Sequence, residues 1–228
     1  MSDIKLDLHI HTTYSGDSLI KPRDLLKFAR KKELDGISIT DHGNLTAYDK
    51  IKKEFNEAGM ILIPGMEIET HIGEVIGLFI DKEIDTSDNN FFTIVKQIKK
   101  KNGLVIIPHP FDFLRRNHLK MGIISSDIIQ KYIDGIEIMN SRIILKYCVN
   151  KAKSFNKKHQ LFETGGSDAH TLNEIGRGYT LIKNVSDFSL QSIKKSLLDK
   201  KSESIGKLSS PFVHVITVLN KFKKRLYF

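Results

Sequence analysis

The sequence has neither the cysteine pairs that stabilise many extracellular proteins nor the long apolar runs that anchor proteins in membranes. Its 228 residues include one cysteine, Cys148, and no tryptophan. A single cysteine excludes a disulfide within the chain, so we expect a cytoplasmic protein. No apolar run reaches the ~18 residues that a membrane span needs, and the charged N-terminal segment does not read as a signal peptide. The chain must therefore bury its own core, which its length allows in one main domain.

The positive charge is concentrated near the C-terminus. The net charge is +9, but residues 194–228 hold nine lysines and arginines against two acids. We expect residues 1–205 to form the main domain and residues 206–228 to form a basic, apolar helix. The segment 207–228 is predicted to pack on the main domain or on a second subunit. The alternatives are contact with an anionic membrane surface or with nucleic acid.

Short apolar runs alternate with helical stretches, which predicts parallel β-α units. The expected strands are 4–11, 36–41, 60–70, 74–80, 103–108, 135–139, 162–166 and 179–182. The expected helices are 22–32, 46–57, 90–101, 125–132, 143–158 and 190–198. Only three residues separate the third strand from the fourth. This is too few for a helix, so the two strands can instead form a hairpin.

The first expected strand ends in Asp7-Leu8-His9-Ile10-His11. Alternate residues of a strand point to the same side, so His9 and His11 can bind one metal ion together. By itself this pair is weak evidence, because two surface histidines can have this spacing by chance.

Polar residues follow four further strands, and the carboxyl ends of parallel strands converge on one face of an α/β fold. These residues are Asp41, His42, Glu67, His109, Asp168 and His170. Imidazoles and carboxylates without thiolates suit zinc, manganese or iron. The donors are too many for one tetrahedral ion, so we expect two or three divalent ions.

Six motifs, in the order in which they follow one another along residues 4 to 185, resemble those of the polymerase and histidinol phosphatase (PHP) domain phosphoesterases. The motifs are Asp7-Leu8-His9-Ile10-His11, Ser15-Gly16-Asp17, Thr40-Asp41-His42, Pro64-Gly65-Met66-Glu67, Ile107-Pro108-His109-Pro110 and Gly166-Ser167-Asp168-Ala169-His170. The resemblance implies an α/β fold, a distorted seven-stranded (β/α)7 barrel like a smaller TIM barrel, with a trinuclear metal site at the carboxyl ends of the strands.

The resemblance also implies nine metal ligands. They are His9, His11, Asp17, His42, Glu67, Glu74, His109, Asp168 and His170. Glu74 departs from the family pattern, which often has a histidine there. We align Glu74 because the strand follows it directly, and His71 is the alternative ligand.

The resemblance implies hydrolysis of phosphate esters by a metal-activated hydroxide, and neither Ser15 nor Ser167 is expected to be a nucleophile. Possible substrates are small phosphomonoesters, nucleotides and the 5′ ends of oligonucleotides. Arg142 and Arg177 are the first candidates for a phosphate contact during the reaction, because arginine binds phosphate in a bidentate manner. Asp7 is expected to orient one of the two histidines beside it, or else to support the strand.

Further candidates for substrate binding follow the fifth and sixth expected strands. They are Arg115, Arg116 and Asn140. Glu137 lies on the same strand as Asn140, and each of the two is expected either beside the ligands or in contact with substrate.

Two other functions compete with the phosphoesterase. An amidohydrolase also begins with two histidines on a barrel strand, but it usually adds a metal-bridging lysine, and no expected strand ends in one. A PHP-like module without activity would serve only as an interaction partner, and the nearly complete ligand set argues against this.

Overall fold

The computed structural model describes residues 2–210 and residue 213, and within them nine strands form one sheet. The strands are β1 (Ser2–Ile10), β2 (Gly36–Ile39), β3 (Ile61–Thr70), β4 (Gly73–Leu78), β5 (Leu104–Ile107), β6 (Gly135–Asn140), β7 (Phe162–Gly166), β8 (Gly178–Val185) and β9 (Ser202–Gly206).

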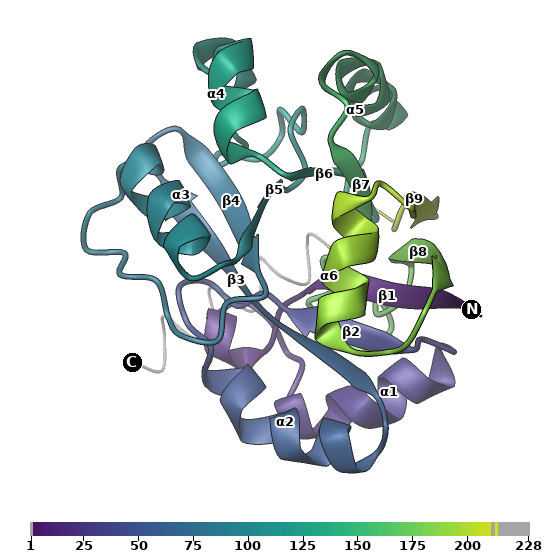
Figure 1. Cartoon of the computed structure of the whole chain (residues 1–228). Coiled ribbons are helices and arrows are strands. Elements are labelled where there is room, and N and C mark those ends of the chain that lie inside the picture. The colour runs from purple at the N-terminus through teal and green to yellow at the C-terminus, as the bar shows by residue number, and fades with distance from the viewer. Residues whose placement is uncertain (1, 211–212, 214–228) are drawn as a thin grey trace.

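The sheet curls into a barrel of seven strands with a two-stranded extension (Figure 1). The strand order is β7-β6-β5-β4-β3-β2-β1-β8-β9. Just beyond β7, Ala169 forms a parallel bridge with Ile10, which closes β1 to β7. The other end of β1 pairs with the antiparallel strand β8, which in turn pairs with β9. Strands β3 and β4 form the hairpin, so β4 runs antiparallel to both of its neighbours.

Six α-helices complete the described part of the fold. They are α1 (Leu25–Lys31), α2 (Thr46–Glu57), α3 (Phe91–Lys100), α4 (Ser126–Tyr132), α5 (Lys146–His159) and α6 (Leu190–Leu198). Helices α1 to α5 surround the sheet, and α6 lies across one end of it (Figure 1). Ile193 and Leu197 of α6 pack among apolar residues near the amino ends of the strands, such as Ile4 and Ile61. The amino end of the barrel is thus filled, and the carboxyl end is left for a site.

The fold agrees with the sequence prediction except in the strand count. All eight expected strands and all six expected helices are present, with small shifts at their ends. The ninth strand, β9, was not predicted. Helix α5 begins at Lys146 rather than at residue 143. The predicted C-terminal helix lies almost entirely outside the described residues. No helix in residues 2–210 is long and apolar enough to cross a bilayer.

Candidate metal centre

Four side chains converge at the carboxyl end of β1. The Nε2 atoms of His9 and His11 lie 3.1 Å apart. Each also lies 3.2–3.6 Å from an oxygen of Glu67 and from Oδ1 of Asp168. Four ligands about 2.1 Å from a tetrahedral ion are roughly 3.4 Å from one another. The spacing of these four groups therefore fits one divalent ion.

Hydrogen bonds at the outer ring nitrogens fix how these imidazoles face the cluster. Nδ1 of His9 lies 3.0 Å from Oε1 of Glu137 on β6. Nδ1 of His11 lies 2.8 Å from Oγ of Ser15, whose hydroxyl donates to Asp41 at 2.6 Å. Because the hydroxyl hydrogen points to Asp41, Ser15 accepts from His11. Both rings carry a proton on Nδ1 in this arrangement, which leaves Nε2 free to bind a metal ion.

A second group adjoins the first through Glu67. Nε2 of His109 lies 3.2 Å from Oε1 of Glu67 and 3.7 Å from Oε2 of Glu74. Glu74 is buried. His71 is exposed, and its Nδ1 accepts a hydrogen bond from the backbone of Phe91. The structure thus brings Glu74 to the cluster and leaves His71 outside it.

A third group lies on the other side of His11. Oδ2 of Asp17 is 3.3 Å from Nε2 of His170 and 3.7 Å from Nε2 of His42. Nδ1 of His170 is 2.9 Å from the carbonyl oxygen of Asp168, which again leaves Nε2 available as a ligand. His42 is about one-third exposed, so this group lies closest to solvent.

The backbone at two predicted ligands is unusual. His109 and Asp168 both have left-handed conformations, with φ of 48° and 53°. Such residues cost free energy outside glycine and cluster at functional sites. Gly166 allows the backbone of β7 to lie close to His9. A Cβ at this position would lie 2.4 Å from Cβ of His9 and 2.7 Å from Oε1 of Glu137. The end of β7 can therefore pass directly beside His9.

The cluster is strongly polarised without metal. Burial acts to lower the pKa of His11, but the carboxylates of Asp168 and Glu67 outweigh it and raise this pKa to about 10. Burial and the charge of Glu67 raise the pKa of Glu74 to about 8. Burial acts to raise the pKa of Asp168, but Arg115 and the nearby histidines hold it well below its usual range. Protons thus balance carboxylate charge where a metal ion would bind.

The two carboxylate oxygens of Asp168 have different surroundings, one facing the cluster and the other facing Arg115 and Asn140. Its Oδ1 has no hydrogen-bond partner within residues 2–210 and faces the histidines. Its Oδ2 accepts hydrogen bonds from Nη2 of Arg115 and, at 3.1 Å, from Nδ2 of Asn140. Asn140 is fully buried and also donates to Glu137 at 2.9 Å. Asn140 thus lies beside a ligand, which was one of the two positions expected for it, whereas Arg115 stays partly exposed at the centre.

Two predicted site residues instead stabilise the loop after β7. The carboxylate of Asp7 accepts hydrogen bonds from the backbone of Ser167 and Gly176, while Glu137 orients the His9 ring. Burial raises the pKa of Asp7 to about 6. Arg142 is buried, with Nε 3.1 Å from Oε1 of Glu174. Asp7 thus has the supporting role that was one of the two expected for it, and the phosphate contact expected of Arg142 gains no support from its pairing with Glu174.

Arg116 and Arg177 are exposed, and no ion pair joins either of them to the cluster in the described part of the chain. The predictions for these two arginines therefore gain no support. Asp41 was named in the motif Thr40-Asp41-His42 but was not predicted to be a ligand. In the structure it accepts a hydrogen bond from Ser15 and so orients that hydroxyl.

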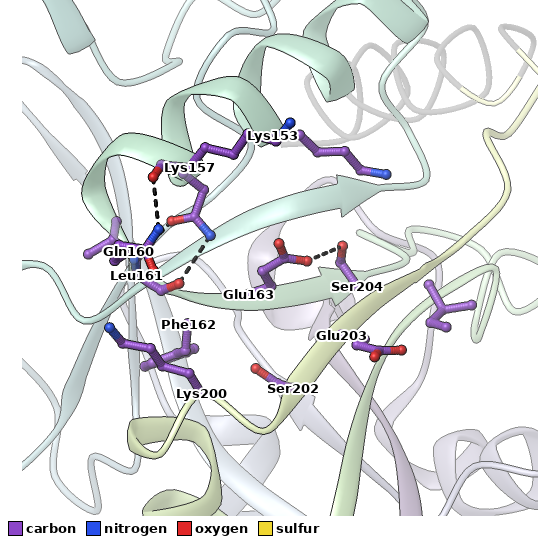
Figure 2. Close-up of a pocket in the computed structure, with 12 residues that line it drawn as sticks. Lys153, Lys157, Gln160, Leu161, Phe162, Glu163, Lys200, Ser202, Glu203 and Ser204 are labelled. Carbon is purple, nitrogen blue, oxygen red and sulfur yellow. Dashed lines mark hydrogen bonds between the residues drawn. The ribbon is translucent and has the colours of Figure 1, made fainter.

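A separate hollow of about 630 Å³ lies near the opposite end of the barrel (Figure 2). It is formed by the C-terminal half of α5, the start of β7 and β9, with Lys157 and Lys200 among its lining residues. Glu163 inside it accepts a hydrogen bond from Ser204 at 3.0 Å (Figure 2). None of the nine predicted ligands lines this hollow.

Comparison with known proteins identifies the family. Residues 7–163 match the model of the PHP domain, and residues 149–201 match that of a PHP-associated region. The chain belongs to the PHP domain family. The protein MJ1587 of Methanocaldococcus jannaschii, which is uncharacterised, is 36% identical over 60% of this chain and 82% of its own length. MJ0417 of the same organism is 34% identical over 77% of this chain and 69% of its own length.

Two further similarities are to a curated protein and to a solved structure. A 5′-3′ exoribonuclease of Haemophilus influenzae is 32% identical over 34% of this chain and 30% of its own length. A solved structure from Bacteroides vulgatus superposes with a TM-score of 0.77 over 90% of this chain at 20% identity. It is described as a two-domain protein containing a predicted PHP-like metal-dependent phosphoesterase, and this chain spans 65% of it. The likeness shows that the two chains share the barrel fold.

Proposed function

We propose that this protein hydrolyses phosphate esters at a centre of two or three divalent metal ions. The candidate ions are zinc, manganese and iron, because imidazole and carboxylate donors suit all three. The observation that carries the proposal is the convergence of nine potential ligands, all members of overlapping groups that can hold a metal ion. Such ions supply a hydroxide nucleophile and neutralise phosphate oxygens when bound.

The residues of the chain prepare the centre for a negatively charged substrate. Glu137 and Ser15 hold two imidazoles in the orientation that a metal ion requires. Arg115 contacts Asp168 and remains about one-fifth exposed. We assign it the role of binding a phosphate oxygen, because a guanidinium forms charge-assisted hydrogen bonds with phosphate. Positioning and charge neutralisation are the main requirements of phosphoryl transfer, so no serine or cysteine nucleophile is needed.

The proposed substrates are small phosphomonoesters, nucleotides and the 5′ ends of oligonucleotides. The similarity to a 5′-3′ exoribonuclease supports a substrate with a nucleic-acid end.

The test is phosphate release by metal-loaded protein from p-nitrophenyl phosphate, its bis ester, nucleotides and short RNA. We expect turnover of at least one substrate, its loss with a chelator, and its loss in Asp168→Asn. Glu163→Gln, in the opposite hollow, is the matched control and should keep full activity. Metal-loaded protein that turns over none of these substrates would contradict the proposal and favour an interaction module.

The assignment of Glu74 has its own test. Glu74→Gln and His71→Ala are compared for metal affinity by competition with a chelator. We expect weaker binding in Glu74→Gln and unchanged binding in His71→Ala. Loss of affinity in His71→Ala alone would reverse the assignment.

A further inference from the structure

Three aromatic rings surround the ammonium group of one lysine near the start of α5. The ammonium of Lys151 lies 4.9 Å from the ring centre of Phe111, 5.0 Å from that of Phe113 and 6.0 Å from that of Tyr147. Phe113 and Tyr147 are 50% and 61% exposed, whereas Phe111 is buried beneath them. We call Phe113, Tyr147 and Lys151 the aromatic platform.

The aromatic platform is built from one loop and the start of one helix, both of which follow the carboxyl ends of barrel strands. Phe113 belongs to the loop after β5, two residues before Arg115, which binds Asp168. Tyr147 and Lys151 lie in the first two turns of α5. The strand before that helix, β6, ends at Asn140, which also binds Asp168. The segments that carry the platform are therefore joined to the centre through Asp168, which contacts both Arg115 and Asn140.

The composition of the platform indicates its ligand. Exposed apolar side chains that lie together mark binding sites. A lysine among them adds a positive charge, which an apolar protein partner would leave unpaired and a phosphate would neutralise. Aromatic rings with interspersed cations bind single-stranded nucleic acid, because every base has a flat face that stacks on a ring.

We propose that Phe113, Tyr147 and Lys151 form a subsite for the nucleotides next to the phosphate ester at the metal centre. The rings stack on bases, and Lys151 neutralises a backbone phosphate. This inference rests on the proposed function and narrows its substrate class to single-stranded oligonucleotides in preference to phosphates without a base.

The absence of tryptophan from the chain allows a direct test of stacking. Phe113→Trp and Tyr147→Trp each introduce a single tryptophan into the full chain, which can be excited selectively at a wavelength where tyrosine hardly absorbs. Phe188→Trp is the matched control, because Phe188 is 55% exposed but follows β8 at the amino end of the barrel. The probes are a 5′-phosphorylated tetra-adenylate and an abasic phosphodiester of the same length, added to metal-loaded protein in which hydrolysis is followed in parallel.

We expect the tetra-adenylate to quench both platform tryptophans and to leave Phe188→Trp unchanged, while the abasic chain quenches none. Equal quenching at all three positions, or no quenching at the platform, would overturn the inference. Stacking on one ring changes affinity by roughly ten-fold. Phe113→Ala and Tyr147→Ala should therefore each raise KM for the tetra-adenylate by about that factor, with kcat unchanged.

Two controls separate nucleotide binding at the platform from general attraction to positive charge and from self-association. Lys151→Ala should weaken oligonucleotide binding and reduce its salt dependence. Lys157→Ala, on the same helix but in the opposite hollow, should do neither. Equal effects of the two would overturn the inference. So would self-association that Phe113→Ala abolishes, because the face would then bind a second copy.

Hydrolysis of ribose 5-phosphate distinguishes this inference from the proposed function. If ribose 5-phosphate is hydrolysed but the tetra-adenylate neither binds nor quenches, the subsite fails and the phosphoesterase stands. If the tetra-adenylate quenches but no phosphate ester is hydrolysed, the proposed activity fails and the subsite stands as a binding site.

Discussion

At the residue scale, a hydrogen bond on the outer side of an imidazole decides which nitrogen faces the metal centre. Glu137 holds Nδ1 of His9, and Ser15 with Asp41 holds Nδ1 of His11. Outer partners of this kind commonly raise metal affinity by about 10- to 100-fold. The metal affinity of this centre therefore depends on residues that are not ligands.

Glu137→Gln tests this dependence. We expect a metal affinity lower by about ten-fold or more, because the amide loses the charge that supports the proton on Nδ1 of His9. Competition with a fluorescent chelator measures the affinity. Glu163→Gln on the adjacent strand, whose side chain pairs with Ser204, should bind metal as the wild type does. Equal affinities of wild type and Glu137→Gln would refute the role of Glu137.

The titration of the cluster predicts how stability depends on pH. Without metal, His11 and Glu74 have pKa values of about 10 and about 8, above their ordinary values of 6.5 and 4.5. The folded state therefore binds more protons than the unfolded chain. The stability from these groups is present below the ordinary values and is lost as pH rises through about 8 and then about 10.

We therefore expect the Tm of chelator-treated protein to fall by several degrees between about pH 7 and pH 9.5. A bound divalent ion replaces these protons and should remove most of the fall. Differential scanning fluorimetry of the metal-free and metal-loaded protein measures both. A metal-free Tm that is constant or rises over this range would contradict the protonation of His11 and Glu74 in the folded state.

At the element scale, close packing between β7 and β1 sets the position of His9. Gly166→Ala would place a methyl group 2.4 Å from Cβ of His9. We expect a lower Tm and weaker metal binding together, because the strand must move away from the ligand. Gly122, which has open space around the position of a Cβ, is the matched control, and Gly122→Ala should change neither property. Unchanged metal binding in Gly166→Ala would show that the two strands can separate without disturbing the centre.

The loop after β7 depends on a buried ion pair. Glu174 accepts hydrogen bonds from the backbone of His170 and Thr171, and Arg142 compensates its charge. Removing one partner of a buried pair costs about 3–5 kcal/mol. Arg142→Met should therefore lower the Tm strongly, and Glu174→Gln should do the same. A raised KM with an unchanged Tm in Arg142→Met would instead restore the substrate contact that the sequence predicted.

The sequence predicted most elements because their patterns are local. Helix α2 has the expected bounds. Its apolar residues recur with helical spacing, and a turn precedes them and a glycine follows them. Strand β9 was missed because Ser202–Gly206 is short, polar at three of its five residues and only partly buried, and lies within a charged run. It exists through its pairing with β8, which no local pattern reveals.

At the scale of the whole molecule, the barrel gathers ligands that are far apart in the chain. Parallel strands that end on one face predicted that several of these ligands meet, and the resemblance to the PHP family implied the full set of nine. The order of the motifs was not sufficient to predict which arginine lies at the cluster. Arg142 and Arg177 were the preferred phosphate contacts, yet Arg115 is the one at the cluster. The direction of a side chain after a strand end depends on loop conformation, which spacing does not determine.

The same closure divides the molecule into two ends with different roles. Helix α6 fills the amino end with apolar residues, while the carboxyl end collects the histidines, Arg115 and the aromatic platform. We propose that this carboxyl end holds a centre of two or three divalent ions.

Metal analysis of the purified full chain by mass spectrometry tests this claim most directly, with one variant for each proposed ion. We expect two or three divalent ions per wild-type chain and fewer in His11→Ala, His109→Ala and Asp17→Asn. His159→Ala, at the end of α5, should retain the wild-type content. A wild-type chain that binds no divalent ion from zinc, manganese or iron solutions, or variants that bind as many ions as the wild type, would contradict the claim.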